Sequence, residues 1–141
     1  MRRAARQLGQ LYDTMLEPCG LRTTQFTLMV QIHYCGNASL KNLAELMVMD
    51  LSALGHTLKP LIRDGFVTLV QDDKDKRVKR AILTNLGEAK LAEALPLWKQ
   101  AQSRFDHIVG EEKSKELRAA LSFVGSGELA AAFRQGADAA D

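Results

Sequence analysis

The spacing of apolar residues predicts that most of the chain is helical. In residues 3–16 the apolar side chains recur every three or four positions and share one helical face, made of Leu8, Leu11, Tyr12, Met15 and Leu16. Pro18 and Gly20 are expected to end this helix. A second helix is predicted from Thr23 or Thr24 to the residue before Gly36. Its buried face consists of Phe26, Val30 and either Ile32 or Tyr34.

Two shorter helices and a hairpin are predicted next. Ser39 caps a short helix whose buried residues are Leu40, Leu43, Ala44 and Met47. Asp50 or Ser52 caps the following helix, which ends near Asp64 and turns Leu54, Leu58, Leu61 and Ile62 inward. Residues 66–70 and 78–83 are then rich in β-branched side chains, and the loop between them is charged. This pattern predicts a β-hairpin with a charged tip.

The remaining sequence predicts two long helices. Thr84 is expected to cap a helix that runs to about Val109, with a kink at Pro96, because proline removes a backbone donor. The last helix is predicted from Ser114 to about Phe133, with residues 125–127 as the place where it can break in two. The tail after residue 134 is rich in Ala, Gly and Asp and is expected to fray.

These elements predict a mainly α fold with one small β-hairpin. Two helices joined by a short turn and followed by a hairpin form the pattern of a winged helix-turn-helix. A length of 141 residues fits a single domain. Within residues 1–141 we expect a winged helix-turn-helix lobe at 37–84. Residues 1–22 and 85–134 are expected to form a helical dimerisation region, because apolar faces at both ends of the chain suit an isologous interface.

The charge distribution changes this picture more than the net charge of +2 does. Seven basic residues and four acidic ones lie between Lys59 and Arg80, whereas acidic residues prevail after residue 110. A basic middle segment suits an anionic partner. Neither a membrane span nor a signal peptide is expected, because the apolar runs are short and the first residues are basic. We therefore expect a cytoplasmic protein that does not bind membranes.

The helix at 50–64 and the hairpin tip are the predicted contacts with double-stranded DNA. Opposite the buried face of this helix lie Ser52, Ala53, His56, Lys59 or Pro60, and Arg63, a polar surface that fits a major groove. The N-terminus of the helix is expected to favour a nearby phosphate. At the tip, Arg77 suits the narrow minor groove, and Asp75 is expected to hold its guanidinium. The full predicted set is Ser39, Ser52, Ala53, His56, Lys59, Arg63, Lys74, Asp75, Lys76, Arg77 and Lys79.

Five segments resemble the MarR family of bacterial transcription regulators: residues 21–26, 43–46, 58–67, 73–77 and 83–87. The last two match the family's Asp-x-Arg-Asp-x-Arg wing and the Leu-Thr-x-x-Gly that opens a long helix. The resemblance implies a homodimer, built from the terminal helices, on a pseudo-palindromic operator, and most simply a ligand-responsive repressor. It assigns Asp75 and Arg77 to the wing, and Ser52, Ala53 and His56 to base reading. Lys74 departs from the usual wing arginine and lacks its planar fork, and His56 stands where the family often has arginine.

The resemblance also implies an effector, since relatives sense zinc, oxidants or small phenolic and carboxylate ligands. Tyr12, Phe26, His33 and Trp98 are the candidates to line a crevice for a small aromatic or carboxylate effector, although such residues are also typical of a core. His33 by itself is expected to be packed.

Cys19 is the candidate redox residue. It lies in a turn expected to be exposed, beside a helix N-terminus and Arg22, although it and Cys35 also fit ordinary free thiols. No cofactor or metal is expected, because the three histidines and two cysteines lack ligand spacing. The sequence shows no phosphate loop or nucleophile elbow and predicts no enzyme. Two alternatives stay open: a regulator switched through Cys19, and a protein-interaction module that does not bind DNA.

Overall fold

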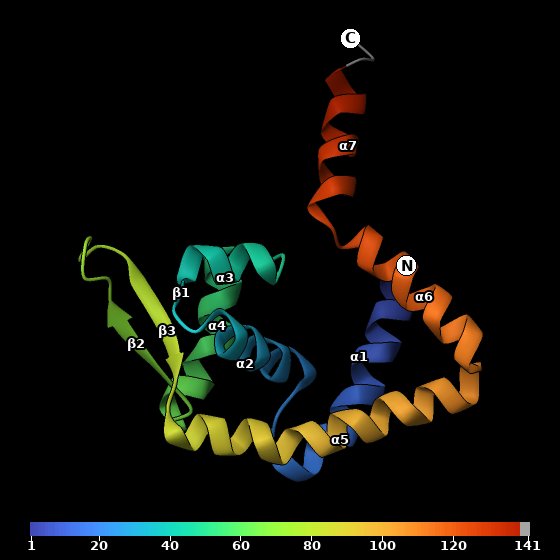
Figure 1. Ribbon diagram of the computed structural model, residues 1–141, viewed down its shortest axis with the longest axis horizontal. Helices are drawn as coiled ribbons and strands as arrows, with labels where there is room; N and C mark the ends of the chain where they lie inside the picture. The colour runs from blue at the N-terminus through green and yellow to red at the C-terminus, as the bar shows by residue number, and fades with distance from the viewer. Residues whose placement is uncertain (139–141) are drawn as a thin grey trace. The chain divides into compact units, whose positions relative to one another are not determined.

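The computed structural model describes residues 1–138, which form two compact units, Met1–Ala101 and the residues from Gln102 onward. Between residues 1 and 138 the elements are, in chain order, α1 (Arg2–Leu16), a 3₁₀ turn (Glu17–Cys19), α2 (Thr23–Cys35), β1 (Ala38–Ser39), α3 (Leu40–Leu46), α4 (Leu51–Arg63), β2 (Val67–Gln71), β3 (Lys79–Leu83), α5 (Asn85–Val109), α6 (Glu111–Val124) and α7 (Gly127–Asp138) (Figure 1). The boundary between the units lies inside α5. The proposed grouping into a lobe at 37–84 and a dimerisation region at 1–22 and 85–134 stays a prediction.

The predicted caps of α3 and α4 are confirmed, whereas Arg22 caps α2 and the expected cap at Thr23 or Thr24 is wrong, because both residues lie inside the helix. The side-chain oxygen of Ser39 accepts a hydrogen bond from the Asn42 N–H at 3.2 Å, and Asp50 Oδ1 accepts one from the Ala53 N–H at 2.7 Å. Each of these bonds satisfies a backbone donor that the first turn of a helix leaves without a partner. The caps therefore fix where α3 and α4 begin, and with them the turn between the two helices.

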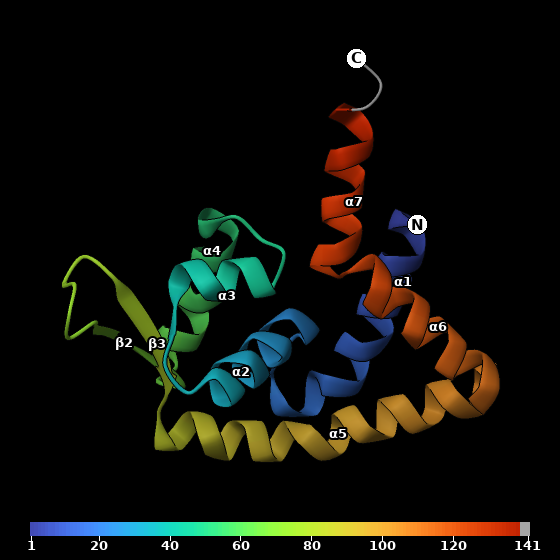
Figure 2. The ribbon, with the colours of Figure 1, turned by 45° about the horizontal axis from the view of Figure 1, so that its top comes forward.

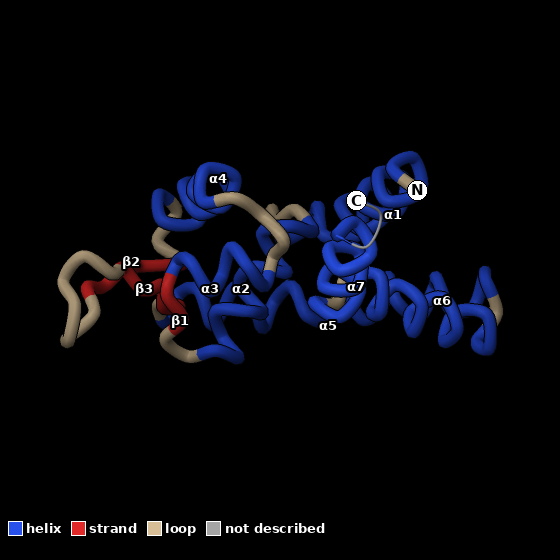
Figure 3. Tube along the Cα trace, turned by 90° about the horizontal axis from the view of Figure 1, so that it is seen from above, coloured by secondary structure: helices blue, strands red, loops and turns tan. Residues whose placement is uncertain are grey.

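The sheet has one strand more than the sequence predicted. The hairpin of β2 and β3 is confirmed, with Val67 opposite Leu83 and Gln71 opposite Lys79. The two-residue strand β1 adds to the other edge of β3, where Ala38 faces Ala81, so the order is β1-β3-β2 (Figure 3). Since β3 contacts α2 and α3 while β2 contacts α4, both strands of the hairpin are attached to helices of the first unit.

The core of the first unit lies between α2, α3, α4 and the sheet. Its fully buried large side chains are Leu16, Leu28, Met29, Ile32, Leu43, Leu54, Leu61 and Val67. Two predicted inward positions are corrected. Tyr34 is exposed while its alternative Ile32 is buried, and Ile62 is 39% exposed, because the α4 face against the core is narrower than predicted.

The start of α5 is joined tightly to the start of β2. The Thr84 hydroxyl donates to the Gly65 carbonyl at 2.5 Å and accepts from the Gly87 N–H at 3.0 Å, which confirms Thr84 as a cap. The Thr84 N–H donates to the Phe66 carbonyl at 3.1 Å. A Cβ at Gly87 would lie 2.9 Å from the Phe66 carbonyl carbon and would overlap its oxygen. The Leu-Thr-x-x-Gly segment therefore fixes the hairpin to the long helix.

In the second unit the predicted last helix is two helices. The break predicted at residues 125–127 is confirmed, and α6 begins at Glu111, three residues before the predicted start. Helix α7 continues to Asp138, so the predicted fraying is wrong up to that residue, and residues 139–141 lie outside the described part. Helix α5 continues through Pro96, and the kink there stays a prediction. No helix within residues 1–138 combines the length and apolarity needed to cross a membrane.

Candidate nucleic-acid interface

Helix α4 presents a polar outer face. Ser52, His56 and Lys59 are exposed, and they lie opposite the buried side chains of the helix, as predicted. Ala53 is only half-buried. Arg63 is exposed, and its Nε donates to Asp64 Oδ1 at 3.0 Å, which lowers the pKa of the Asp64 carboxyl. The exposed polar part of this face therefore consists of positions 52, 56, 59 and 63.

A carboxylate caps the N-terminus of α4, and the phosphate contact expected there stays a prediction. The carboxylate of Asp50 occupies this position, bonded to the Ala53 N–H. A negative charge at that position opposes the approach of a phosphate, and the cap uses one of the backbone donors of the first turn. The Ala53 N–H is therefore already engaged within the chain.

The tip of the wing, defined here as residues 67–83, carries the predicted Asp75–Arg77 pair. Arg77 Nε and Nη2 donate to the two carboxylate oxygens of Asp75, each at 3.1 Å, and the Arg77 N–H donates to the same carboxylate at 3.1 Å. These bonds lower the pKa of the Asp75 carboxyl, which stays ionised at neutral pH. The Arg77 side chain is nevertheless 91% exposed. A guanidinium held in a fixed orientation thus projects into solvent.

A second arginine, which the sequence did not single out, attaches the wing to the rest of the first unit. Arg80 Nη2 and Nε donate to Asp72 Oδ2 at 2.6 and 3.0 Å, and Nη1 donates to the Asn37 carbonyl at 2.7 Å. The Lys74 N–H donates to Asp72 at 2.8 Å and, together with Arg80, lowers the pKa of that carboxyl. The contact joins both wing strands to the loop that follows α2.

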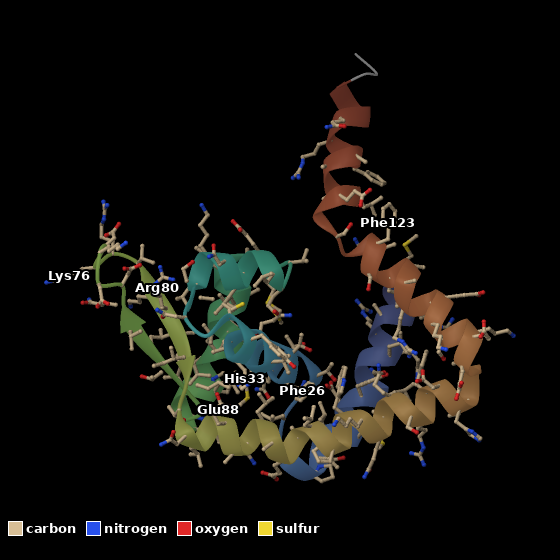
Figure 4. All side chains as sticks on the ribbon, viewed as in Figure 1. Phe26, His33, Lys76, Arg80, Glu88 and Phe123 are labelled. Atoms are coloured by element: carbon tan, nitrogen blue, oxygen red, sulfur yellow. The ribbon has the colours of Figure 1, made fainter. Side chains whose placement is uncertain are left out.

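Three further cations surround Arg77. Lys74, Lys76 and Lys79 are exposed, and none of the hydrogen bonds or ion pairs found in the described part of the chain fixes their ammonium groups. The loop between β2 and β3 extends away from the helices of the first unit (Figure 2), and Lys76 lies at its end (Figure 4). Ser39, in contrast, is half-buried and uses its oxygen as the cap of α3. The wing therefore supplies four of the six exposed cations of the predicted set, and α4 supplies Lys59 and Arg63.

A cavity of about 360 Å³ lies between α2 and α5 in the first unit, lined by Phe26, Thr27, Val30, His33, Tyr34, Leu91, Leu95 and Trp98. Three of the four predicted effector residues line it. Tyr12 is outside the lining and packs on Trp98, with ring centroids 4.7 Å apart, and Phe26 stacks on Trp98 at 4.9 Å. Tyr12 and Phe26 therefore pack on the Trp98 indole, and His33 lines the same cavity as Phe26 and Trp98.

His33 lies at the edge of this cavity and corrects a prediction. Its side chain is 47% exposed instead of packed, and Nδ1 lies 2.9 Å from a carboxylate oxygen of Glu88 (Figure 4). The pair connects α2 to the first turn of α5. A polar group thus stands at the mouth of a largely apolar cavity.

The environment of Cys19 also differs from the prediction. Cys19 is 5% exposed, and its thiol donates to the Leu16 carbonyl at 3.0 Å, because the turn after α1 folds against the core. The exposed thiol is Cys35, at the end of α2. Within residues 1–138 no three His, Cys, Asp or Glu side chains gather as metal ligands would.

The comparisons with known proteins agree with this geometry. Residues 21–79 match the model of the MarR family. An HTH-type transcriptional regulator of Bacillus cereus is 33% identical over 116 residues, which cover 82% of this chain and 77% of the relative. The helix pair with its attached wing defines the class, a DNA-binding winged helix-turn-helix transcription regulator and not an enzyme. The chain belongs to the MarR family.

Solved structures show the same fold. The Mycobacterium tuberculosis transcriptional regulator MosR, in complex with DNA, is 36% identical and superimposes with a TM-score of 0.81 over 94% of both chains. CouR, a transcriptional repressor bound to a DNA duplex, reaches a TM-score of 0.83 over 89% of both chains at 19% identity. A mutant of Escherichia coli MarR complexed with operator DNA reaches 0.79 at 21% identity, over 87% of this chain and 89% of that one. At these two lower identities the similarity concerns the fold.

Proposed function

We propose that this protein is a homodimeric repressor that binds a pseudo-palindromic operator and is released by a small ligand in the cytoplasm. The observation that carries the proposal is the Asp75–Arg77 pair, an oriented and exposed guanidinium at the end of a wing attached to the helix pair. Arginine in this setting suits the negative potential of a narrow minor groove. The MosR relative was solved in complex with DNA. A protein-interaction module has no comparable need for a clustered, exposed positive charge.

In the proposed complex, α4 enters the major groove and the wing follows the adjacent minor groove. Ser52 and His56 hydrogen-bond to base edges, with Ala53 beside them, and Lys59 and Arg63 lie toward the backbone. Arg77 enters the minor groove in the orientation set by Asp75, and Lys74, Lys76 and Lys79 contact phosphates. Ser39 contributes at the start of α3, where its hydroxyl proton is available while its oxygen serves as the cap.

The proposed dimer uses the apolar side chains that the chain leaves in solvent. In the second unit Ile108, Leu117, Leu121, Phe123, Val124 and Phe133 are between 37 and 76% exposed, and Leu11 of α1 is 51% exposed. Figure 4 shows Phe123 on α6. A 40-residue unit with this much exposed apolar surface is typical of a chain that buries it against a second copy. Two copies place two wings and two α4 helices on one duplex.

Fluorescence anisotropy tests the DNA-binding part of the proposal. The probe is a duplex from the region upstream of the protein's own gene, with a scrambled duplex as control, and light scattering gives the mass in the same buffer. Eight exposed wing cations per dimer predict an affinity that falls about 10,000-fold between about 50 and 200 mM salt. The mass expected is twice 15.6 kDa. Equal binding to the scrambled duplex, or a salt-independent affinity, would refute a sequence-specific regulator.

The proposed effector is a small aromatic molecule with a carboxylate or hydroxyl group. The α2–α5 cavity offers Phe26 and Trp98 for stacking, and His33 at its edge as the polar partner. Burial of the Cys19 thiol weighs against the alternative of a redox switch at that residue, because a thiol shielded from solvent reacts slowly.

Intrinsic fluorescence tests this effector site, because Trp98 is the single tryptophan of the chain. Titration with a panel of benzoates and phenols is expected to give a saturable change in emission, together with weaker DNA binding at the same ligand concentration. Val30→Phe, which fills the cavity, is expected to abolish both effects. A compound that releases DNA without changing the Trp98 emission would place the effector elsewhere.

A further inference from the structure

The turn that leads into α4 carries apolar side chains that face solvent. Leu46 is 53% exposed, Val48 is 81% exposed and Leu51, the first residue of α4, is 59% exposed. Three exposed large apolar residues within six positions stand out on a surface segment, since isolated exposed apolar residues are the usual case. This segment, residues 46–51, is called the apolar turn.

The backbone of the apolar turn is strained at one position. Val48 has φ +53°, and within residues 1–138 it is the one residue other than glycine with positive φ. A β-branched side chain disfavours this conformation, which glycine adopts without cost. Strain of this kind persists where the surrounding structure enforces it, and it gathers at functional sites. Val48 thus adopts a backbone conformation that glycine would adopt more easily, and its side chain lies in solvent.

The apolar turn carries no cation for the phosphates of the DNA backbone. No lysine or arginine occurs between residues 42 and 58, and Glu45 and Asp50 make this stretch acidic. Asp50 occupies the N-terminus of α4 through the Ala53 N–H. The apolar turn therefore offers neither a cation for phosphates nor a guanidinium for guanine.

The major groove presents one apolar group that an apolar side chain can contact, the C5-methyl of thymine. Every base pair presents hydrogen-bonding groups there, and thymine adds an apolar group, its C5-methyl. The N-terminal residues of a recognition helix are those that contact base edges. Leu51 and Ser52 are both exposed in the first turn of α4, so an apolar side chain stands beside the proposed reading face at the end of the helix that contacts base edges.

We propose that Leu51 is a specificity-determining residue that reads a thymine methyl group in each half-site, with Val48 extending the apolar contact. This inference rests on the proposed function. Burying a methyl group against Leu51 strengthens binding, because both surfaces leave water. One methyl group of this size corresponds to about a fourfold change in affinity. The operator is expected to contain a thymine opposite Leu51 in each half-site.

Replacing thymine by deoxyuridine tests this inference, because the exchange removes the methyl group and keeps the base pair. The probe is the duplex that the wild-type protein enriches from a random-sequence library, with single thymines exchanged one at a time and affinities measured by anisotropy. At one thymine in each half-site the exchange is expected to weaken wild-type binding about fourfold. For Leu51→Ala the same exchange is expected to have no effect. Leu86→Ala removes a similarly exposed leucine, 56% exposed at the start of α5, and should keep the full sensitivity.

Three outcomes overturn the inference, and they are distinguishable from failure of the proposed function. Tight wild-type binding that is insensitive to every exchange shows that no methyl group is read. An equal sensitivity in Leu51→Ala shows that another residue reads it. A changed particle mass for Leu51→Ala shows that a second copy of the chain covers the apolar turn. Failure to enrich any sequence would instead remove the proposed function, and this inference with it.

Discussion

Replacing Gly87 by alanine is expected to lower the free energy of unfolding of the first unit by about 3 kcal/mol, an overpacking cost at the upper end of the usual range. The new Cβ would overlap the Phe66 carbonyl, which is backbone and cannot rotate away as a side chain would. Relief requires α5 to move from β2, which also strains the bonds of Thr84 to Gly65 and Phe66. Urea denaturation followed by circular dichroism measures the change.

A second glycine provides the matched control. Gly55 lies inside α4, and nothing stands within 4 Å of the Cβ that alanine would add there. Gly55→Ala is therefore expected to stabilise the protein by about 0.8 kcal/mol, the ordinary helix preference for alanine. If Gly87→Ala lowers the free energy of unfolding and Gly55→Ala raises it, the close packing of Gly87 against Phe66 is the cause of the destabilisation. Equal stabilities of Gly87→Ala and the wild type would contradict the contact between α5 and β2.

Replacing Arg77 by alanine is expected to weaken operator binding at least about thirtyfold, because each lost base-reading or groove-inserted arginine costs about 1–3 kcal/mol and a dimer loses two. The two wings of a dimer lose their guanidinium groups together. Folding should be nearly unaffected, because the side chain is 91% exposed and a surface ion pair adds little stability. Anisotropy on the upstream duplex gives the affinity, and a thermal melt confirms the fold.

Two further variants separate shape from charge in this prediction. Arg77→Lys keeps the positive charge and loses the planar fork that Asp75 holds, so its affinity should fall between those of the wild type and Arg77→Ala. Arg134→Ala removes an exposed arginine from α7 and is expected to bind as the wild type does. If the Arg77 and Arg134 variants bind equally well, the wing is not the minor-groove element.

The helices, their caps and the hairpin could be predicted because they depend on local signals. Ser39, Asp50 and Thr84 cap the helices that they were expected to cap, since a capping side chain acts within three residues of its own position. The motifs around the wing and the start of α5 also identified the family, as the relatives confirm. Strand β1 was missed because two residues are too few to show a period of two.

Features that depend on packing could not be predicted from the sequence. The Arg80–Asp72 contact needs the register of β2 and β3, and its third partner, the Asn37 carbonyl, lies 43 residues away along the chain. Cys19 was expected to lie in an exposed turn because Pro18 and Gly20 flank it. The turn is instead held against the core, because Leu16 and Leu21 on either side of it are buried. Phe26, His33 and Trp98 were candidates for an effector site because of their side-chain types. Their position around one cavity follows from the fold and not from the sequence pattern.

The different environments of the two cysteines make this protein suited to labelling without mutagenesis. A maleimide dye reacts with an accessible thiol, so in the folded protein it should attach to exposed Cys35 and spare buried Cys19. Cys35 ends the helix that lines the cavity and lies two residues before Asn37, whose carbonyl accepts from the wing residue Arg80. The emission of a single fluorophore on Cys35 would therefore report on α2 and on the Arg80–Asn37 contact of the wing, without any substitution in the sequence.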